Sequence, residues 1–366
     1  MRYFFSTGEP SGELSATLLA TEIASRDERA SFEGIGAQRM QDFGFKLWAI
    51  NRGWGSITPF SVLARVPRLM IVLSQTIRRL LADPPARVVL VDFGAFNLRL
   101  AGGLRRRGYT GNIIYYFPPG AWFDTASQAR AVANLTVPVP AFRHQYEFYR
   151  SLGLAAHYFG HPLASRYQMR ESRPPPPLDA GTVALLPGSR EAELRHHVPL
   201  LCDALQQLRK ARPGLRAYAV AVDDAAEARL TRMFEKRHLR VTVVHSTPAA
   251  LAHADAAWIA SGTAVLEAAL LGVPSVVFYR MSRFEMGVAR RLYRGAYFAL
   301  PNLVAGCEIV PELTEDEARV EPLVAAIESV LRNPSLQYEA LRALRAELGP
   351  SDALPRIADL VVNAEA

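Results

Sequence analysis

Two short stretches of small residues each follow an apolar run and precede a run with helical spacing. They are residues 185–190, Leu-Leu-Pro-Gly-Ser-Arg, and residues 260–267, Ala-Ser-Gly-Thr-Ala-Val-Leu-Glu. In the second stretch, Ser261, Gly262 and Thr263 stand where a strand should end and a helix should begin. The backbone N–H groups at a helix start have no partners within the helix and readily bind anions. The pattern predicts a seat for the diphosphate of a ligand.

Two charged side chains accompany these loops. Glu267 is the only charge in an otherwise apolar helical run, and its spacing from Thr263 is wrong for a capping box. A carboxylate there needs a partner; an arginine from a neighbouring helix is one candidate, and we favour the other, the ribose hydroxyls of a nucleotide. Arg190, after Gly188 and Ser189, is suited to hold phosphate oxygens by paired hydrogen bonds, although a solvated loop arginine is the alternative.

The segments around these loops alternate between strands and helices in both halves of the chain. Apolar runs with strand character lie at residues 3–6, 32–35, 88–91, 113–117, 183–186, 217–222, 241–244, 257–260 and 275–278. This alternation is typical of a parallel sheet covered by helices, in which ligands bind at the carboxyl ends of the strands. The sequence therefore predicts an α/β protein with two doubly wound units.

A run of four prolines, residues 174–177, separates the two halves. Such a run forms a stiff, extended spacer. We therefore expect an N-terminal domain over residues 1–172, a linker over 173–178 and a C-terminal domain over 179–345. A helix over residues 346–366 is expected to end the chain. This helix could pack back on the N-terminal domain.

Composition limits the classes of function. The chain has 366 residues, 50% of them hydrophobic, and no apolar run long enough to span a membrane. Its net charge of +7 suits an anionic partner, but the arginines are dispersed and no recognition motif accompanies them, so nucleic acid is not expected. The chain starts directly as a strand without a signal peptide, which predicts a cytoplasmic location.

Metal ligands are not expected. No Asp-x-Asp pair is present, and the two cysteines lie far apart without a motif. His157 and His161 have helical spacing, but the glycine and proline beside His161 argue against a helix, so His161 is expected to shape the crevice between the domains. His196 and His197 are expected to face solvent.

Several segments together resemble lipid-A-disaccharide synthase, a two-domain glycosyltransferase family of the GT-B type, over nearly the whole length. The segments are residues 8–13, 34–40, 96–97, 160–162, 185–190, 261–267, 279–281 and 300–303. The resemblance implies two Rossmann-like domains facing across a crevice. It implies inverting, metal-independent transfer of an acylated glucosamine from a UDP-sugar to a lipid-linked sugar phosphate, without a cofactor.

The resemblance also implies which residues face each substrate. On the donor side these are Gly188, Ser189, Arg190, Ser261, Gly262, Thr263, Glu267 and Asn302, and on the acceptor side Gly8, Glu9, Ser11, Gly12, Asn97 and Trp122. A homo-oligomer is compatible with the sequence.

Two departures from the family pattern fall on the acceptor side. The aspartate thought to be the family's catalytic base is replaced by Ala95, and the tryptophan-rich stretch at residues 118–125 keeps Trp122 but loses the adjacent arginine. Three interpretations stay open. The protein is an enzyme that uses another base, an enzyme that uses a different acceptor, or a catalytically silent homologue that binds UDP-sugar or lipid.

Asp92 and Asp124 are the candidate substitute bases. An inverting transfer needs a proton acceptor within hydrogen-bonding reach of the acceptor hydroxyl. Asp92 follows the apolar strand at 88–91, which is the right end of a strand for a ligand, and we take it as the tentative base. Its alternative role is to cap the following loop or helix.

Residues 57–81 combine apolar residues with arginines. This composition predicts a basic amphipathic helix pair, broken at Pro67. Such a segment can lie in the surface of an anionic membrane, and the protein would then be peripheral on the inner membrane. The alternative, which is commoner, is a helix that faces the core and has solvated arginines.

Overall fold

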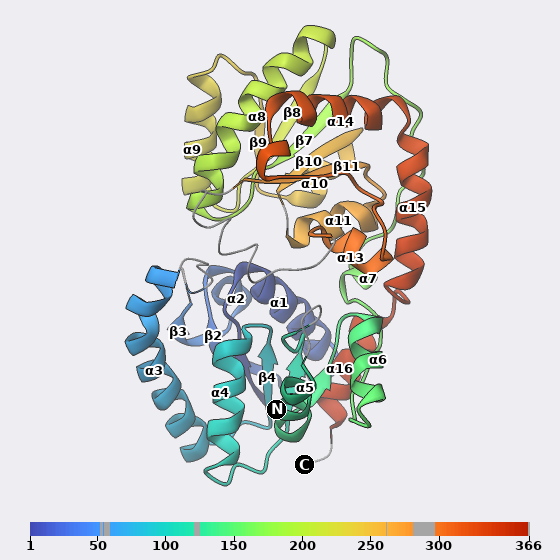
Figure 1. Cartoon of the computed structure of the whole chain (residues 1–366). Helices are drawn as coiled ribbons and strands as arrows, with labels where there is room; N and C mark the ends of the chain where they lie inside the picture. The colour runs from blue at the N-terminus through green and yellow to red at the C-terminus, as the bar shows by residue number, and fades with distance from the viewer. Residues whose placement is uncertain (52–53, 55–58, 121–124, 261, 281–296, 365–366) are drawn as a thin grey trace. The chain divides into compact units, whose positions relative to one another are not determined.

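The computed structural model describes residues 1–51, 54, 59–120, 125–260, 262–280 and 297–364. Three residues named above, Trp122, Asp124 and Ser261, lie outside them. The chain divides into two compact units, Met1–Arg166 with Leu348–Ala366, and Tyr167–Glu347 (Figure 1). Each unit is built on one parallel sheet.

The first sheet has the order β3-β2-β1-β4-β5-β6. Its strands are β1 (Arg2–Ser6), β2 (Ser31–Gly36), β3 (Lys46–Ile50), β4 (Arg87–Val91), β5 (Ile113–Tyr116) and β6 (Val137–Val139). Its helices are α1 (Pro10–Ala24), α2 (Gln38–Phe43), α3 (Pro59–Ala82), α4 (Gly94–Arg105), α5 (Ala126–Leu135), α6 (Arg143–Ser151), α7 (Leu163–Arg166) and α16 (Ala353–Asn363).

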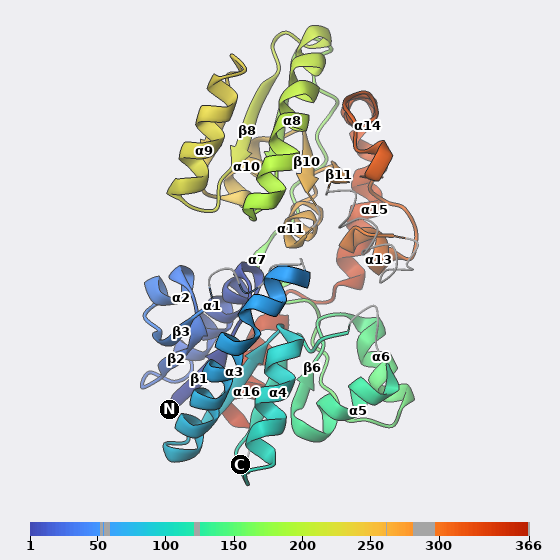
Figure 2. The same cartoon turned by 60° about the vertical axis from the view of Figure 1, so that its left-hand side comes forward.

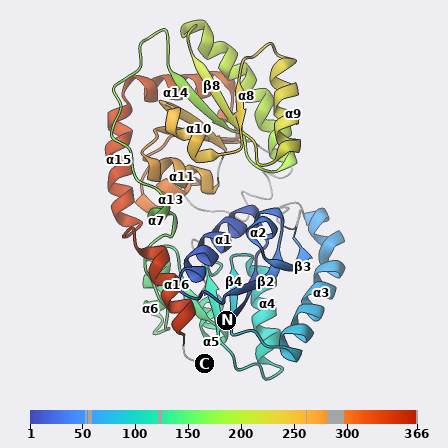
Figure 3. The same ribbon diagram turned by 180° about the vertical axis from the view of Figure 1, so that it is seen from behind.

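Both faces of this sheet are buried, and its central strands β1 and β4 are mostly apolar after their first residues, Arg2 and Arg87. Alternate residues of β1 point to opposite faces: Phe4 packs with α3 and α4, whereas Tyr3 and Phe5 pack with α1 and α16. Figure 2 shows α3 and α4 on one side of the sheet, and Figure 3 shows α1 and α2 on the other.

The second sheet has the order β12-β11-β10-β7-β8-β9. Its strands are β7 (Thr182–Leu186), β8 (Arg216–Val220), β9 (Thr242–Val244), β10 (Ala256–Ala260), β11 (Ser275–Tyr279) and β12 (Glu312–Thr314). Its helices are α8 (Glu191–Ala211), α9 (Asp224–Glu235), α10 (Thr247–His253), α11 (Thr263–Leu271), α13 (Leu300–Ala305), α14 (Val320–Arg332) and α15 (Pro334–Glu347).

Both sheets have the strand order of Rossmann folds. The order reverses between β1 and β4 in the first unit, and between β7 and β10 in the second. Ligands of such sheets bind beside this reversal, at the carboxyl ends of the strands. The segments that follow these four strands begin at Thr7, Asp92, Pro187 and residue 261, and all four carry candidate site residues from the sequence. The topology therefore brings the candidates together in two groups, one in each unit.

The second unit starts before the proline run, not after it. Arg170 donates its backbone N–H to Leu271 at 3.2 Å and its Nη1 to the carbonyl of Ala254 at 2.8 Å. Residues 167–172, which we assigned to the N-terminal domain, therefore belong to the second unit. The proline composition marked a stiff segment, but long-range hydrogen bonds decide where a unit begins.

Helix α3 is one continuous helix from Pro59 to Ala82, so the predicted break at Pro67 is wrong. Proline removes one backbone hydrogen bond and crowds the preceding turn. Pro67 lies on the exposed side of the helix, where water can satisfy the carbonyl that loses its partner.

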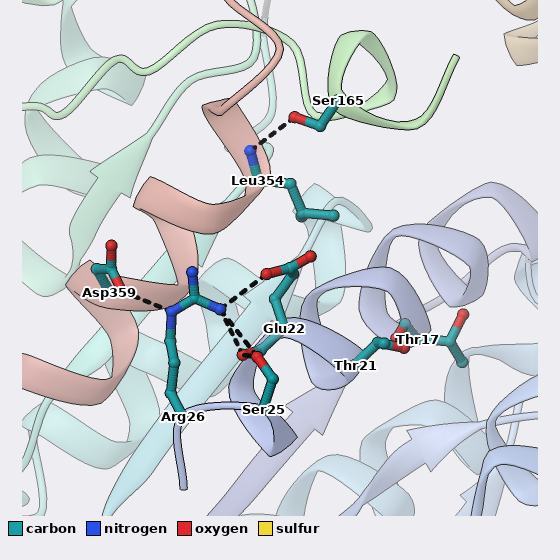
Figure 4. A network of polar contacts seen from close by, with 8 residues as sticks. All are labelled: Thr17, Thr21, Glu22, Ser25, Arg26, Ser165, Leu354 and Asp359. Atoms are coloured by element: carbon teal, nitrogen blue, oxygen red, sulfur yellow. Dashed lines mark hydrogen bonds and ion pairs between the residues drawn. The ribbon is translucent and has the colours of Figure 1, made fainter. Parts of the chain in front are cut away.

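The last helix, α16, packs against α1 in the first unit (Figure 4). Arg26 joins the two, because its Nη1 donates to Glu22 at 2.7 Å and its Nε donates to Asp359 at 2.5 Å. At the start of α16, the backbone N–H of Leu354 donates to Ser165 Oγ at 3.0 Å.

Among the helices that the structure describes, none is long and apolar enough to cross a lipid bilayer.

Candidate functional site

The loop after β7 already holds an anion from its own chain. Gly188 adopts φ 106°, and a Cβ atom there would lie 2.3 Å from Glu193 Oε2. Glu193 Oε2 accepts the backbone N–H groups of Ser189 at 3.0 Å and Arg190 at 3.1 Å. Gly188, Ser189 and Arg190 are expected on the donor side, but in this structure the backbone N–H groups of Ser189 and Arg190 are taken by the Glu193 carboxylate.

Arg190 is the N-cap residue of α8, and its side chain is held in place. Its Nη1 donates to Glu193 Oε1 at 3.0 Å, and the hydroxyl of Tyr279 donates to the same oxygen at 3.2 Å. The Arg190 side chain is still 37% exposed, whereas Glu193 is 8% exposed. Arg190 therefore combines a fixed position with access to solvent, as a residue that binds a phosphate requires.

The start of α11 is the second candidate anion-binding site. Its N-cap residue is Gly262, at φ 143°, which has no side chain to satisfy the first N–H groups of the helix. Gly262 is exposed and Thr263 is half-buried. This helix start, rather than the loop after β7, is the stronger candidate for a diphosphate.

Glu267 lies one turn into α11 and is buried. The hydroxyl of Tyr167 donates to Glu267 Oε1 at 2.5 Å, so the carboxylate has a defined orientation. Thr263 and Glu267 are four positions apart and therefore lie on the same side of the helix.

His197 is buried, so the predicted exposure is wrong. Burial lowers its pKa, which favours the neutral imidazole. Its Nδ1 lies 2.7 Å from the carbonyl of Pro187, and its Nε2 lies 3.0 Å from the carbonyl and 3.1 Å from the backbone nitrogen of Arg280. His197 thus joins the loop after β7 to the end of β11. Its spacing from Leu194 and Leu201 on the inner face of α8 was the signal that the sequence offered.

The side-chain amide of Asn302 makes its hydrogen bonds to other residues of the second unit. Its Nδ2 donates to the carbonyl of Val310 at 2.8 Å and to Glu312 Oε1 at 2.6 Å. Its Oδ1 accepts the N–H groups of Ile309 at 2.8 Å and Val310 at 2.9 Å. The contacts in this structure hold α13 against β12, and they leave the side chain no donor for a ligand.

In the first unit, the segment after β1 forms a tight turn into α1. Gly8 is in close contact with the ring of Phe93, since a Cβ atom at Gly8 would lie 2.1 Å from Phe93 Cγ. Glu9 is the N-cap residue of α1, and Ser11 lies half-buried in its first turn. Gly12 is buried against the end of β4. These acceptor-side candidates therefore lie beside Asp92, as the topology requires.

Asp92 combines solvent access with a raised pKa. The surrounding chain removes water from the carboxyl group and raises its pKa to about 6, with a smaller contribution from the negative charge of Glu9. The N–H of Phe93 donates to the carboxylate and acts in the opposite direction. Although the surrounding chain crowds the carboxyl group, Asp92 as a residue is exposed, so a substrate can reach it from solvent.

Asn97 is buried and positions the backbone of Asp92. Its Nδ2 donates to the carbonyls of Asp92 at 2.8 Å and Ser6 at 3.2 Å, and its Oδ1 accepts the Ser6 hydroxyl at 2.6 Å. These bonds join the ends of β1 and β4. Ala95 is exposed in the first turn of α4.

Two other features lie away from the reversals. Asp224, Glu227 and His245 form the one group among the described residues whose spacing could hold a metal ion, and His245 Nε2 already lies 2.7 Å from Glu227 Oε2. A cavity of about 530 Å³ lies beside the proline run and is lined by Arg173, Arg216 and neighbouring residues at the amino ends of β7 and β8.

Comparison with known proteins gives a family and a fold. The family model for lipid-A-disaccharide synthetase matches residues 3–346. The lipid-A-disaccharide synthase of Anaeromyxobacter sp. (strain K) is 31% identical over 97% of this chain and 95% of its own length. Among solved structures, the S. aureus MnaA–UDP co-structure has a TM-score of 0.64 at 11% identity and covers 98% of this chain and 95% of that one. The spinosyn rhamnosyltransferase SpnG has a TM-score of 0.59 at 17% identity, with 100% of both chains covered.

Two parallel sheets with flanking helices and these structural relatives establish a GT-B fold. The match to the family model over nearly the whole chain, together with near-full-length relatives, shows that the chain belongs to the lipid-A-disaccharide synthase family, whose members are glycosyltransferases of lipid A biosynthesis.

Proposed function

We propose that this protein transfers an acylated glucosamine from a UDP donor to a glycolipid phosphate acceptor, with inversion and without a metal ion. One observation carries the donor assignment. The start of α11, with its glycine N-cap, and Glu267 one turn later lie on one helix at the strand-order reversal of the second sheet. The N–H groups suit a diphosphate, and the buried carboxylate suits ribose hydroxyls. The UDP in the MnaA co-structure supports the nucleotide class.

We further propose that Asp92 is the proton acceptor. It is exposed at the reversal of the first sheet, and its pKa of about 6 leaves it ionised at neutral pH yet basic enough to take a proton. A silent homologue that binds UDP-sugar or lipid is the second candidate, because Ala95 offers no carboxylate where the family has one.

Incubation of the protein with a UDP-linked acylated glucosamine tests the function directly. We expect release of UDP that depends on an acylated glucosamine phosphate acceptor and that continues in the presence of a chelator. UDP release that is the same with and without acceptor would contradict the transfer, and nucleotide binding without any release would favour the silent homologue.

We also propose that α3 binds an anionic membrane surface from the cytoplasmic side. Val66, Met70 and Ile71 are 41%, 50% and 58% exposed, so the described part of α3 carries a strip of apolar side chains in water. Arg68 and Arg78 are also exposed on this helix. Apolar residues with arginines beside them suit an interface of anionic lipids.

Replacing both Met70 and Ile71 with glutamate should reduce sedimentation with phosphatidylglycerol vesicles several-fold, because it removes apolar contact and adds repulsion. Sedimentation of the parent protein should fall as salt rises. Leu336→Glu is the matched control, since Leu336 is 80% exposed in the second unit. Equal binding to neutral vesicles, or an equal loss in the control, would contradict the assignment.

A further inference from the structure

Phe93 has an unusual backbone conformation at the strand-order reversal of the first sheet. Asp92 and Phe93 follow one another in the left-handed region, at φ 48° and φ 50°. A bulky residue rarely adopts this conformation, and such strain clusters where ligands bind. The carbonyl of Asp92 is fixed from two sides, because it accepts Asn97 Nδ2 at 2.8 Å and the hydroxyl of Tyr115 at 3.0 Å. The surrounding structure therefore imposes the turn.

The turn places the ring of Phe93 in an aromatic stack. Its centroid lies 5.4 Å from that of Phe96 and 5.8 Å from that of Trp54, with interplanar angles of 25° and 30°. Trp54 and Phe96 are buried, whereas Phe93 is half-buried, so Phe93 is the member of the stack that reaches solvent. Gly8 lets the turn after β1 approach the ring, because any side chain there would overlap with it.

Asp92, which is an exposed residue, is adjacent in sequence to this ring. An aromatic surface next to a carboxylate matches the two sides of a hexose, whose C–H groups contact an apolar ring while its hydroxyl groups donate to the acid. A lipid tail would use the ring but not the acid, and a free phosphate would be repelled by the acid. The combination therefore selects a sugar ring.

We propose that Phe93 is a binding residue on which the sugar ring of the acceptor rests, so that one of its hydroxyl groups faces Asp92. This inference rests on the proposed function for the class of acceptor. It adds the residue that orients the ring, and it requires no nucleotide, so it can be tested separately from transfer.

Saturation-transfer difference NMR with glucosamine 1-phosphate and no nucleotide tests the proposal. We expect the parent protein to transfer saturation to the ring protons of the sugar. Phe93→Leu should weaken binding about tenfold, near the upper range for one aromatic contact, whereas Phe93→Tyr should keep it. Phe93→Gly should lose binding as well, and it relieves the left-handed backbone, so a loss in both variants is not explained by backbone strain. Unchanged far-UV circular dichroism and thermal unfolding of the variants check that they fold.

Phe43→Leu is the matched control. Phe43 is 37% exposed and packs with Phe32 and Phe45 in the same unit, away from the strand-order reversal. Its replacement should leave the NMR signal unchanged. Binding by Phe93→Gly equal to that of the parent, or no binding by the parent, would overturn the proposal. Sugar binding that depends on Phe93 in a protein that transfers nothing would support the proposal and contradict only the transferase function.

Discussion

Exchange of Asp92 for asparagine is expected to lower the rate of sugar transfer by about 10²–10⁴, which is the usual contribution of a general base. Asparagine keeps the size of the side chain but cannot accept the proton of the acceptor hydroxyl. Single-turnover measurement with saturating donor and acceptor isolates this step. The affinity for UDP should stay unchanged, because Asp92 belongs to the first unit and the donor residues to the second.

The pH dependence gives this prediction a second readout. The base must be ionised, and the pKa of Asp92 is raised to about 6, mainly because the surrounding chain removes water from it. The rate should therefore rise with pH through about 6 and level off above it. Stability should change in the opposite direction. The folded protein binds this proton more tightly than the unfolded chain does. The cost of burying the charged carboxylate is therefore relieved as the pH falls from about 6 towards 3.8, the ordinary pKa of an aspartate, and the free energy of unfolding should rise over this range.

The outcomes of this exchange separate the remaining candidates. Asp42→Asn is the matched control, since Asp42 is exposed on α2 in the same unit and should not affect the rate. An Asp92→Asn variant as active as the parent would make Asp92 a loop residue, and Glu9 or Asp124 the next candidate base. A parent without turnover whose Ala95→Asp variant gains activity would be a homologue that has lost the chemistry and kept the fold.

The strand exits of this protein could be predicted from sequence because they depend on local patterns. Apolar runs that end in glycine and serine marked the loops after β7 and β10, and the parallel topology then brought these loops together. The strand before Asp92 was equally clear. In each case the composition of a few adjacent residues carries the signal, and the rules for parallel sheets supply the long-range arrangement.

Features that depend on distant partners could not be predicted in this way. Asn302 turns inward to residues 309–312. His197 looked like a polar helix residue but lies on the inner face of α8, where two backbone groups satisfy it. The left-handed turn at Phe93 depends on Asn97 and Tyr115, which no local rule connects to it.

Replacement of Glu267 or Arg190 with alanine is expected to weaken UDP binding about tenfold to a hundredfold each. A lost hydrogen bond to a charged group costs about 1.5–3 kcal/mol, which corresponds to this range. Tyr167→Phe should cause a smaller loss, because it removes only the hydroxyl that orients Glu267. Calorimetric titration with UDP in the presence of a chelator measures all three effects and tests the absence of a metal requirement.

Glu339→Ala and Arg342→Ala provide matched controls for this titration. These residues form an ion pair on α15 in the same unit, at 2.6 Å, and both side chains are more than half exposed. Their loss should leave UDP affinity unchanged, because exposed ion pairs contribute little and this one lies away from the reversal. Failure of the parent protein to bind UDP in chelator would overturn the donor site. If Arg190→Ala alone left binding unchanged, its pairing with Glu193 would be purely structural, and the start of α11 would carry the phosphate contacts.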